Sequence, residues 1–209
     1  ELEQFTNTYF GLLAKKAAPF GFQPEPLVAA VWKGTKAMVK NDGSAPNDRR
    51  FWDTFCPLVG VEEAVLRPVF DKFYGEEFHG AKAACGENPY AAQAVRGLKA
   101  QGYDVVLATN PIFPLVGVRT RLSWVGLAPE DFSLVTTYEN SRFCKPNPAY
   151  FQEIVEKLES GEESLEDSMK LFEEGAKLSA LCYETLDKAE QKITELTPLA
   201  ADEECHEET

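Results

Sequence analysis

The residue content of the chain changes near residue 150, and this break constrains the fold more than any other feature of the sequence. Residues 1–150 hold 12 of the 14 glycines, 12 of the 13 prolines and 21 of the 24 aromatic residues. They also hold 16 acidic and 16 basic residues, whereas residues 151–209 hold 18 acidic and 5 basic residues. The whole net charge of −13 therefore belongs to the second segment. We expect two different kinds of structure, joined near residue 150.

This distribution limits the environment and the partners of the chain. An acidic surface repels phosphate groups, so residues 151–209 are not expected to bind nucleic acid directly. No apolar run approaches the roughly 18 residues that span a membrane, and no apolar leader follows Glu1. The five cysteines are widely spaced and form no Cys-x-x-Cys pair, which indicates reduced thiols and a cytoplasmic protein. Because Glu1 stands where a methionine would be, we expect the natural start to lie upstream.

Residues 1–150 predict a helical part followed by an α/β part. Up to about residue 96 the pattern is helical and rich in aromatic residues, with breaks near residues 24–26, 41–47 and 86–89. A helix is predicted from Pro89 to Ala100, and the apolar run Tyr103–Ala108 predicts a strand buried on both faces. A helix over about 114–125 and a strand over 132–137 follow. This alternation indicates a parallel sheet.

Polar residues follow both predicted strands. Thr109 and Asn110 come directly after the first strand, and Lys145 lies in a loop after the second. Ligands of parallel sheets bind beyond the carboxyl ends of the strands. A hydroxyl group, backbone amides and an ammonium group in that place suit a phosphate dianion. Without such a ligand, Thr109 would be a turn residue and Lys145 a solvated surface charge.

Two strings of residues, 105–110 (Val-Val-Leu-Ala-Thr-Asn) and 145–148 (Lys-Pro-Asn-Pro), resemble the second and third motifs of haloacid dehalogenase superfamily phosphatases. The resemblance implies that residues 1–87 form a helical cap and residues 88–150 part of an α/β core. It also implies that Thr109, with Asn110 beside it, holds the transferring phosphoryl group. Lys145 would neutralise the charge of that group.

The acidic groups of that family's reaction are missing. The family uses an aspartate nucleophile and a second aspartate two residues later, but the chain contains no Asp-x-Asp. The late acidic motif that helps to hold Mg²⁺ does not follow Lys145 either. Thr109 and Lys145 alone can hold a phosphate but cannot attack it. We therefore expect an incomplete, inactive phosphatase-like segment with a marginal core and open sheet edges, and Mg²⁺ only in a complete enzyme.

Residues 151–196 predict an antiparallel helical hairpin. A short apolar stripe from Phe151 to Leu158 ends at Gly161, and Ser164 with Asp167 resembles a capping box that starts a long helix. The fold class is thus mixed, an incomplete α/β segment followed by an all-α hairpin. The long helix cannot hide its stripe alone, so a partner is required. The expected contact residues are Phe151, Val155, Leu158, Leu165, Met169, Phe172, Leu186 and Ile193.

Four blocks of this segment, 153–162, 164–168, 171–175 and 189–193, resemble the small subunit of exodeoxyribonuclease VII. The resemblance implies a non-catalytic partner of the large subunit in a cytoplasmic bacterial enzyme that degrades single-stranded DNA to oligonucleotides. A generic helical hairpin or coiled-coil tail is the alternative. Residues 197–209 form an acidic tail that we expect to be disordered, and Cys205-His206 within it is too small a set of ligands for a metal site.

The string 150–158 fits both resemblances, as the helix after the phosphatase lysine and as the first helix of the small subunit. The sequence therefore predicts a hybrid chain, formed by gene fusion, recombination or faulty sequence assembly. Three hypotheses follow. The chain is a nuclease subunit, or a Mg²⁺-dependent phosphatase whose Asp-x-Asp lies upstream of Glu1, or a hairpin with an inert front segment.

Overall fold

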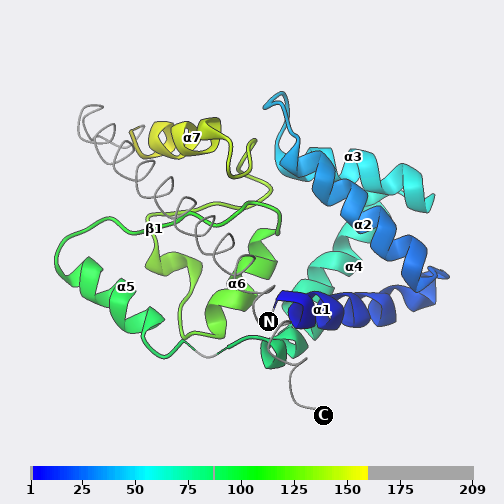
Figure 1. Cartoon of the computed structure of the whole chain (residues 1–209), viewed down its shortest axis with the longest axis horizontal. Helices are drawn as coiled ribbons and strands as arrows, with labels where there is room; N and C mark the ends of the chain where they lie inside the picture. The colour runs from blue at the N-terminus through cyan, green and yellow to red at the C-terminus, as the bar shows by residue number, and fades with distance from the viewer. Residues whose placement is uncertain (1, 87, 160–209) are drawn as a thin grey trace, which may run out of the picture. The chain divides into compact units, whose positions relative to one another are not determined.

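The computed structural model describes residues 2–86 and 88–159 (Figure 1). Contacts divide the chain into two units, of which the first, Glu1–Glu156, holds nearly all of these residues. No helix in the described part is long and apolar enough to cross a membrane. The helical elements before residue 90 are α1 (Leu2–Ala17), η1 (Ala18–Phe20), α2 (Pro24–Val39), α3 (Asn47–Val59), α4 (Glu63–Gly75) and η2 (Glu77–Ala84). The later elements are α5 (Ala91–Ala100), β1 (Val106–Leu107), α6 (Leu115–Ser123), η3 (Pro129–Asp131), β2 (Leu134–Val135) and α7 (Pro148–Glu159).

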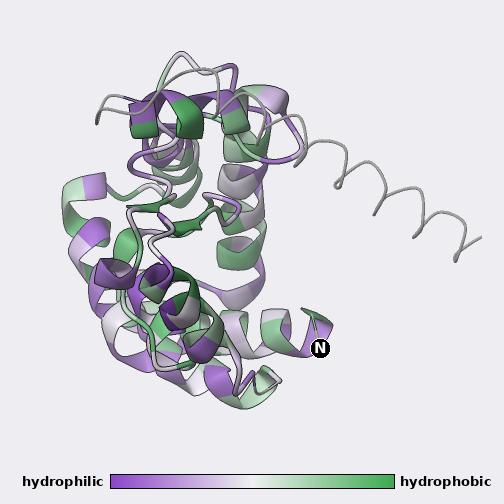
Figure 2. Ribbon diagram, turned by 90° about the vertical axis from the view of Figure 1, so that its left-hand side faces the viewer, coloured by the Kyte–Doolittle hydropathy of each residue, from purple (hydrophilic) through white to green (hydrophobic). Residues whose placement is uncertain are grey.

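Aromatic side chains form the core of the helical part. Phe55, Phe73 and Phe78 are completely buried, and rings of this core pack edge to face, as Phe55 and Phe70 do, or stacked, as Phe51 and Phe55 do. Helices α2 and α3 lie side by side (Figure 1), and Gly34 permits their close approach, since a Cβ there would lie 2.6 Å from the ring of Phe51. Figure 2 shows hydrophobic and hydrophilic bands on the helices, as amphipathic helices require. The predicted helical character of this part is confirmed.

The α/β part contains the predicted alternation in a reduced form. Strands β1 and β2 pair in parallel, with Val106 opposite Leu134 and Leu107 opposite Val135. Helix α5 begins two residues after the predicted start at Pro89, and α6 is followed by Gly126 in the left-handed conformation at φ 73°. The predicted parallel pairing is confirmed, within a mostly helical structure that has a small two-stranded sheet.

The predicted burial of the first strand on both faces is wrong. Strand β1 has two residues, both half-buried, and Tyr103 is 61% exposed. The carbonyls of Val105 and Leu107 accept hydrogen bonds from the backbone N–H groups of Ser133 and Thr136, the two residues that flank β2, at 2.9 and 3.1 Å. Since successive residues of a strand point their backbone groups to opposite edges, those of Val106 face the other edge. No strand of the described residues pairs there, so that edge is open.

Helix α7 closes the described part of the chain. It begins at Pro148, three residues before the predicted stripe, because proline is favoured in the first turn of a helix. Tyr150 and Ile154, both within the first unit, are its buried residues and lie one turn apart on one face of the helix. The predicted boundary at residue 150 thus falls inside one continuous helix.

Candidate phosphate-binding site

The structure brings Thr109, Asn110 and Lys145 together at the carboxyl end of β1. The Lys145 ammonium group donates a hydrogen bond to the carbonyl of Ala108 at 3.0 Å. The backbone N–H of Lys145 donates to Oδ1 of Asn110 at 3.1 Å. The Thr109 hydroxyl donates to the carbonyl of Asn110 at 3.2 Å. Lys145 follows Thr109 by 36 residues and Asn110 by 35 residues in the sequence, yet all three lie at one strand end.

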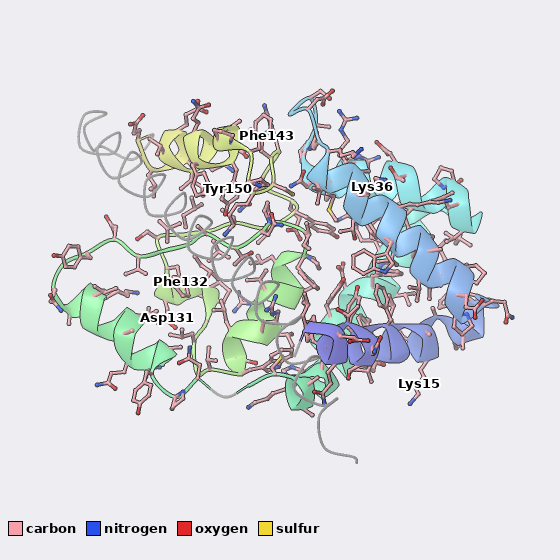
Figure 3. All side chains as sticks on the ribbon, viewed as in Figure 1. Lys15, Lys36, Asp131, Phe132, Phe143 and Tyr150 are labelled. Atoms are coloured by element: carbon pink, nitrogen blue, oxygen red, sulfur yellow. The ribbon has the colours of Figure 1, made fainter. Side chains whose placement is uncertain are left out.

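Two buried hydroxyl groups hold this strand end in place. The carbonyl of Thr109 accepts hydrogen bonds from the Tyr150 hydroxyl at 2.6 Å and from the Thr136 hydroxyl at 2.9 Å. Tyr150 lies on the side of α7 that faces the strands (Figure 3). Burial raises the pKa of Tyr150 to about 12, so its hydroxyl stays a donor at neutral pH. Sequence reasoning missed both residues, although Thr136 follows β2 much as Thr109 follows β1.

Asn47 connects the helical part to both loops of the site. Its side chain is completely buried and donates to the carbonyl of Pro111 at 3.1 Å and to the sulfur of Cys144 at 3.5 Å. Its Oδ1 accepts from Asn41 at 2.8 Å. Burial raises the pKa of the Cys144 thiol to about 11, so this cysteine is neutral and no nucleophile at neutral pH. The first residue of α3 thereby fixes the loops that carry Asn110 and Lys145.

A cavity of about 1020 Å³ adjoins the strand end. Leu107, Thr109 and Val118 form part of its wall, and its basic lining residues are Lys82 and Arg121. The described residues that line it include no aspartate or glutamate. The electrostatics of this cavity therefore favour an anion over a cation.

The groups that the described residues place at this strand end are of the kind that bind a phosphate. No hydrogen bond or ion pair of the described residues joins a carboxylate to Thr109 or Lys145. Across residues 2–86 and 88–159, no group of three or more His, Cys, Asp or Glu side chains is placed to hold a metal ion. An ammonium group and a hydroxyl at a strand end can neutralise and orient a phosphate, but an attacking group is required for transfer.

The expected partner-binding residues are described only in part. Phe151, Val155 and Leu158 lie on α7 and are half-buried, on flanks beside the buried Tyr150–Ile154 face. The remaining five lie outside the described residues; they are Leu165, Met169, Phe172, Leu186 and Ile193.

Comparison with known proteins finds two families in the chain. The profile of the haloacid dehalogenase-like hydrolases matches residues 25–165, more than half of the chain. The profile of the exonuclease VII small subunit matches residues 151–195. The two matches overlap in residues 151–165, at the string that fits both resemblances. No solved structure matches the chain.

Three of the relatives found are exodeoxyribonuclease 7 small subunits. The exodeoxyribonuclease 7 small subunit of Bdellovibrio bacteriovorus is 51% identical over 51 residues, which cover 24% of this chain and 69% of the relative. The small subunit of Pseudomonas syringae pv. syringae is 48% identical over 60 residues, which cover 29% of this chain and 72% of the relative. The small subunit of Geobacter metallireducens is 55% identical over 42 residues, and the chain spans only 55% of that relative's length.

Proposed function

The chain belongs to the haloacid dehalogenase-like hydrolase family in residues 25–165 and to the exonuclease VII small-subunit family in residues 151–195. We propose that the small-subunit segment is the part that carries the function of the chain. In this proposal residues 151–196 are a non-catalytic small subunit that binds the large subunit of exodeoxyribonuclease VII. The complex would degrade single-stranded DNA to oligonucleotides in a bacterial cytoplasm. The observation that carries the proposal is the 51% identity over 51 residues, most of one relative's length.

Charge and patterning support a protein partner over a nucleic-acid partner. The segment from residue 151 carries 18 acidic and 5 basic residues, so its polar surface repels the DNA backbone. Its apolar stripe recurs at three- and four-residue spacing, as in helices that dock in an apolar groove. DNA binding and catalysis would then belong to the large subunit.

A pull-down of the full chain with an exodeoxyribonuclease VII large subunit tests this function. We expect co-purification, and degradation of single-stranded DNA by the mixture. The double substitution Phe172→Asp with Leu186→Asp should abolish co-purification, because a buried unpaired carboxylate is costly at an apolar interface. The matched control is Phe20→Asp with Leu98→Asp, two exposed side chains of the first unit. Binding that survives the first pair of substitutions would refute the proposed contact face.

A second candidate function is phosphate binding by the hydrolase-like part without turnover. It is favoured by the position of Lys145, whose ammonium group and backbone N–H both bond to residues 108–110. The Tyr150 and Thr136 hydroxyl groups fix the same strand end, so the site is organised before an anion arrives. The missing Asp-x-Asp predicts that a bound phosphate ester is not cleaved.

Titration with inorganic phosphate, followed by calorimetry, tests this second function. We expect Lys145→Met to weaken phosphate binding, whereas Lys99→Met, a change at the end of α5, should leave it unchanged. A phosphatase assay with p-nitrophenyl phosphate and Mg²⁺ should show no hydrolysis above the uncatalysed rate. Hydrolysis that Lys145→Met abolishes would establish an active phosphatase instead.

A further inference from the structure

A second cavity, of about 170 Å³, lies in the helical part of the first unit, and neither proposed function uses it. Helices α1–α4 supply most of its wall, and Phe113 and Tyr138 close it from the α/β side. Leu2 and Trp32, which also line it, are 81% and 52% exposed, so the cavity reaches solvent between α1 and α2. An apolar cavity of about 150 Å³ in another protein holds benzene. This cavity is therefore large enough for one substituted aromatic ring.

The lining selects for a neutral aromatic molecule. Ten of its fifteen side chains are aromatic, and none of them is ionised at neutral pH. Aromatic rings pack favourably on one another in offset or edge-to-face geometry, and pairs of this lining such as Tyr9–Phe10 and Trp52–Phe70 already pack edge to face. A charged ligand would lose its hydration in this cavity without gaining an ion pair from the lining.

The Tyr138 hydroxyl group in the lining has a proton to offer, whereas the hydroxyl groups of Tyr9 and Tyr74 are hydrogen-bonded to each other at 2.8 Å. The indole N–H of Trp52 donates to the Tyr138 hydroxyl at 3.4 Å, so the oxygen of Tyr138 acts as an acceptor. Among the described residues no acceptor is found for the proton of Tyr138 itself. Burial raises the pKa of Tyr138, so this proton is retained at neutral pH. A buried donor without an acceptor is unfavourable, and a ligand oxygen would relieve that cost.

We propose that this cavity binds a neutral, single-ring aromatic molecule that carries one hydrogen-bond acceptor, about the size of p-cresol. The ring lies among the aromatic side chains, and the Tyr138 hydroxyl donates to the acceptor. The proposal is independent of nuclease-subunit and phosphate-binding functions, because none of the residues that support those functions lines this cavity.

Calorimetric titration of the full chain with three ligands of similar size tests the proposal. We expect p-cresol to bind, and toluene, which lacks the acceptor, to bind about tenfold more weakly. Benzoate, the charged analogue, should give no binding at millimolar concentration. Failure of both p-cresol and toluene to bind would overturn the proposal, as would tight binding of benzoate.

Variants locate the ligand within the chain. Tyr138→Phe should weaken p-cresol binding by about tenfold and leave toluene binding unchanged, while Tyr90→Phe, at a 73% exposed position, should alter neither. Two further variants, made separately, enlarge side chains of the lining and should weaken the binding of both p-cresol and toluene; they are Val31→Phe and Thr35→Leu. Circular dichroism identifies which of the two filled variants is folded. Unchanged binding in a folded filled variant would overturn the location, and equal effects of Tyr138→Phe on both ligands would overturn the role of the hydroxyl.

Discussion

At the residue scale, the Asn47 side chain connects the helical part of the first unit to the candidate site. Its amide group bonds to the loop after β1, to the loop that carries Lys145 and to Asn41. Because the residue is completely buried, Asn47→Ala leaves the Pro111 carbonyl without this donor. We expect a loss of about 1–3 kcal/mol in the free energy of unfolding. Urea unfolding measures it, with the exposed Asn88→Ala as control; equal stability of the two variants would contradict this role.

Tyr150 predicts a pH dependence at the same scale. Burial raises its pKa to about 12, above the ordinary value of 10. The folded state therefore keeps the proton longer than the unfolded state does. The stability due to this hydroxyl is complete below pH 10 and is lost as the pH rises through 12. Accordingly, the difference in unfolding free energy between the native chain and Tyr150→Phe should shrink from pH 9 to pH 11.5. A constant difference over that range would show that Tyr150 has the same pKa in the folded and unfolded states. The control is Tyr103→Phe, which removes a hydroxyl group from a side chain that is 61% exposed.

The local sequence could reveal Thr109, Asn110 and Lys145 but not the residues that hold them. A hydroxyl residue after an apolar run and a lysine before a proline are visible as patterns. Asn47 and Tyr150 act over 64 and 41 residues of sequence separation, through bonds to backbone carbonyls. No periodicity marks such contacts, because any polar side chain of suitable length can make them.

At the scale of the elements, helix α2 depends on a close contact with α3 at one glycine. A Cβ at Gly34 would lie 2.6 Å from the Phe51 ring, whereas a Cβ at Gly11 of α1 meets no atom within 4 Å. Alanine favours a helix over glycine by about 1 kcal/mol. We therefore expect Gly11→Ala to stabilise the protein by about 0.5–1 kcal/mol. Gly34→Ala should destabilise it by about 1–2 kcal/mol, because overpacking outweighs the helix preference.

Thermal unfolding of both glycine variants checks this prediction in one experiment. The two substitutions are chemically identical, so their difference isolates the contact with Phe51. If the Gly34→Ala variant is as stable as the Gly11→Ala variant, the Phe51 ring moves aside without a cost in free energy.

The same scale shows which elements the sequence could predict. Helices α5 and α6 and the parallel pairing follow from apolar runs and from turn residues such as Gly126. The length and burial of β1 cannot be predicted in this way, because they depend on the elements that pack against the strand. An apolar run is buried on both faces only if other elements cover both, and α5 contains no buried residue. The aromatic core of α1–α4 explains how the unit is nonetheless organised, since its burial is independent of the sheet.

At the scale of the whole molecule, α7 is the helix in which the two family matches overlap. Tyr150 and Ile154 form its buried face within the first unit, and its half-buried flank includes Phe151 and Val155, which we propose for the partner. A helix that serves two functions can do so only if its two faces are energetically separable. Residues on one face should then affect stability, and residues on the other should affect binding.

A pair of adjacent substitutions tests this separation. Ile154→Ala should lower the free energy of unfolding of the first unit by about 2–4 kcal/mol, because Ile154 is only 8% exposed. Tryptophan fluorescence follows that unfolding alone, since Trp32, Trp52 and Trp124 all lie in the first unit. Val155→Asp should instead weaken binding of the large subunit by about tenfold or more, with a smaller effect on stability. If both variants lose stability and binding in the same proportion, the two faces of α7 are not separable. Binding of the nuclease large subunit would then depend on the folded first unit as well as on the hairpin.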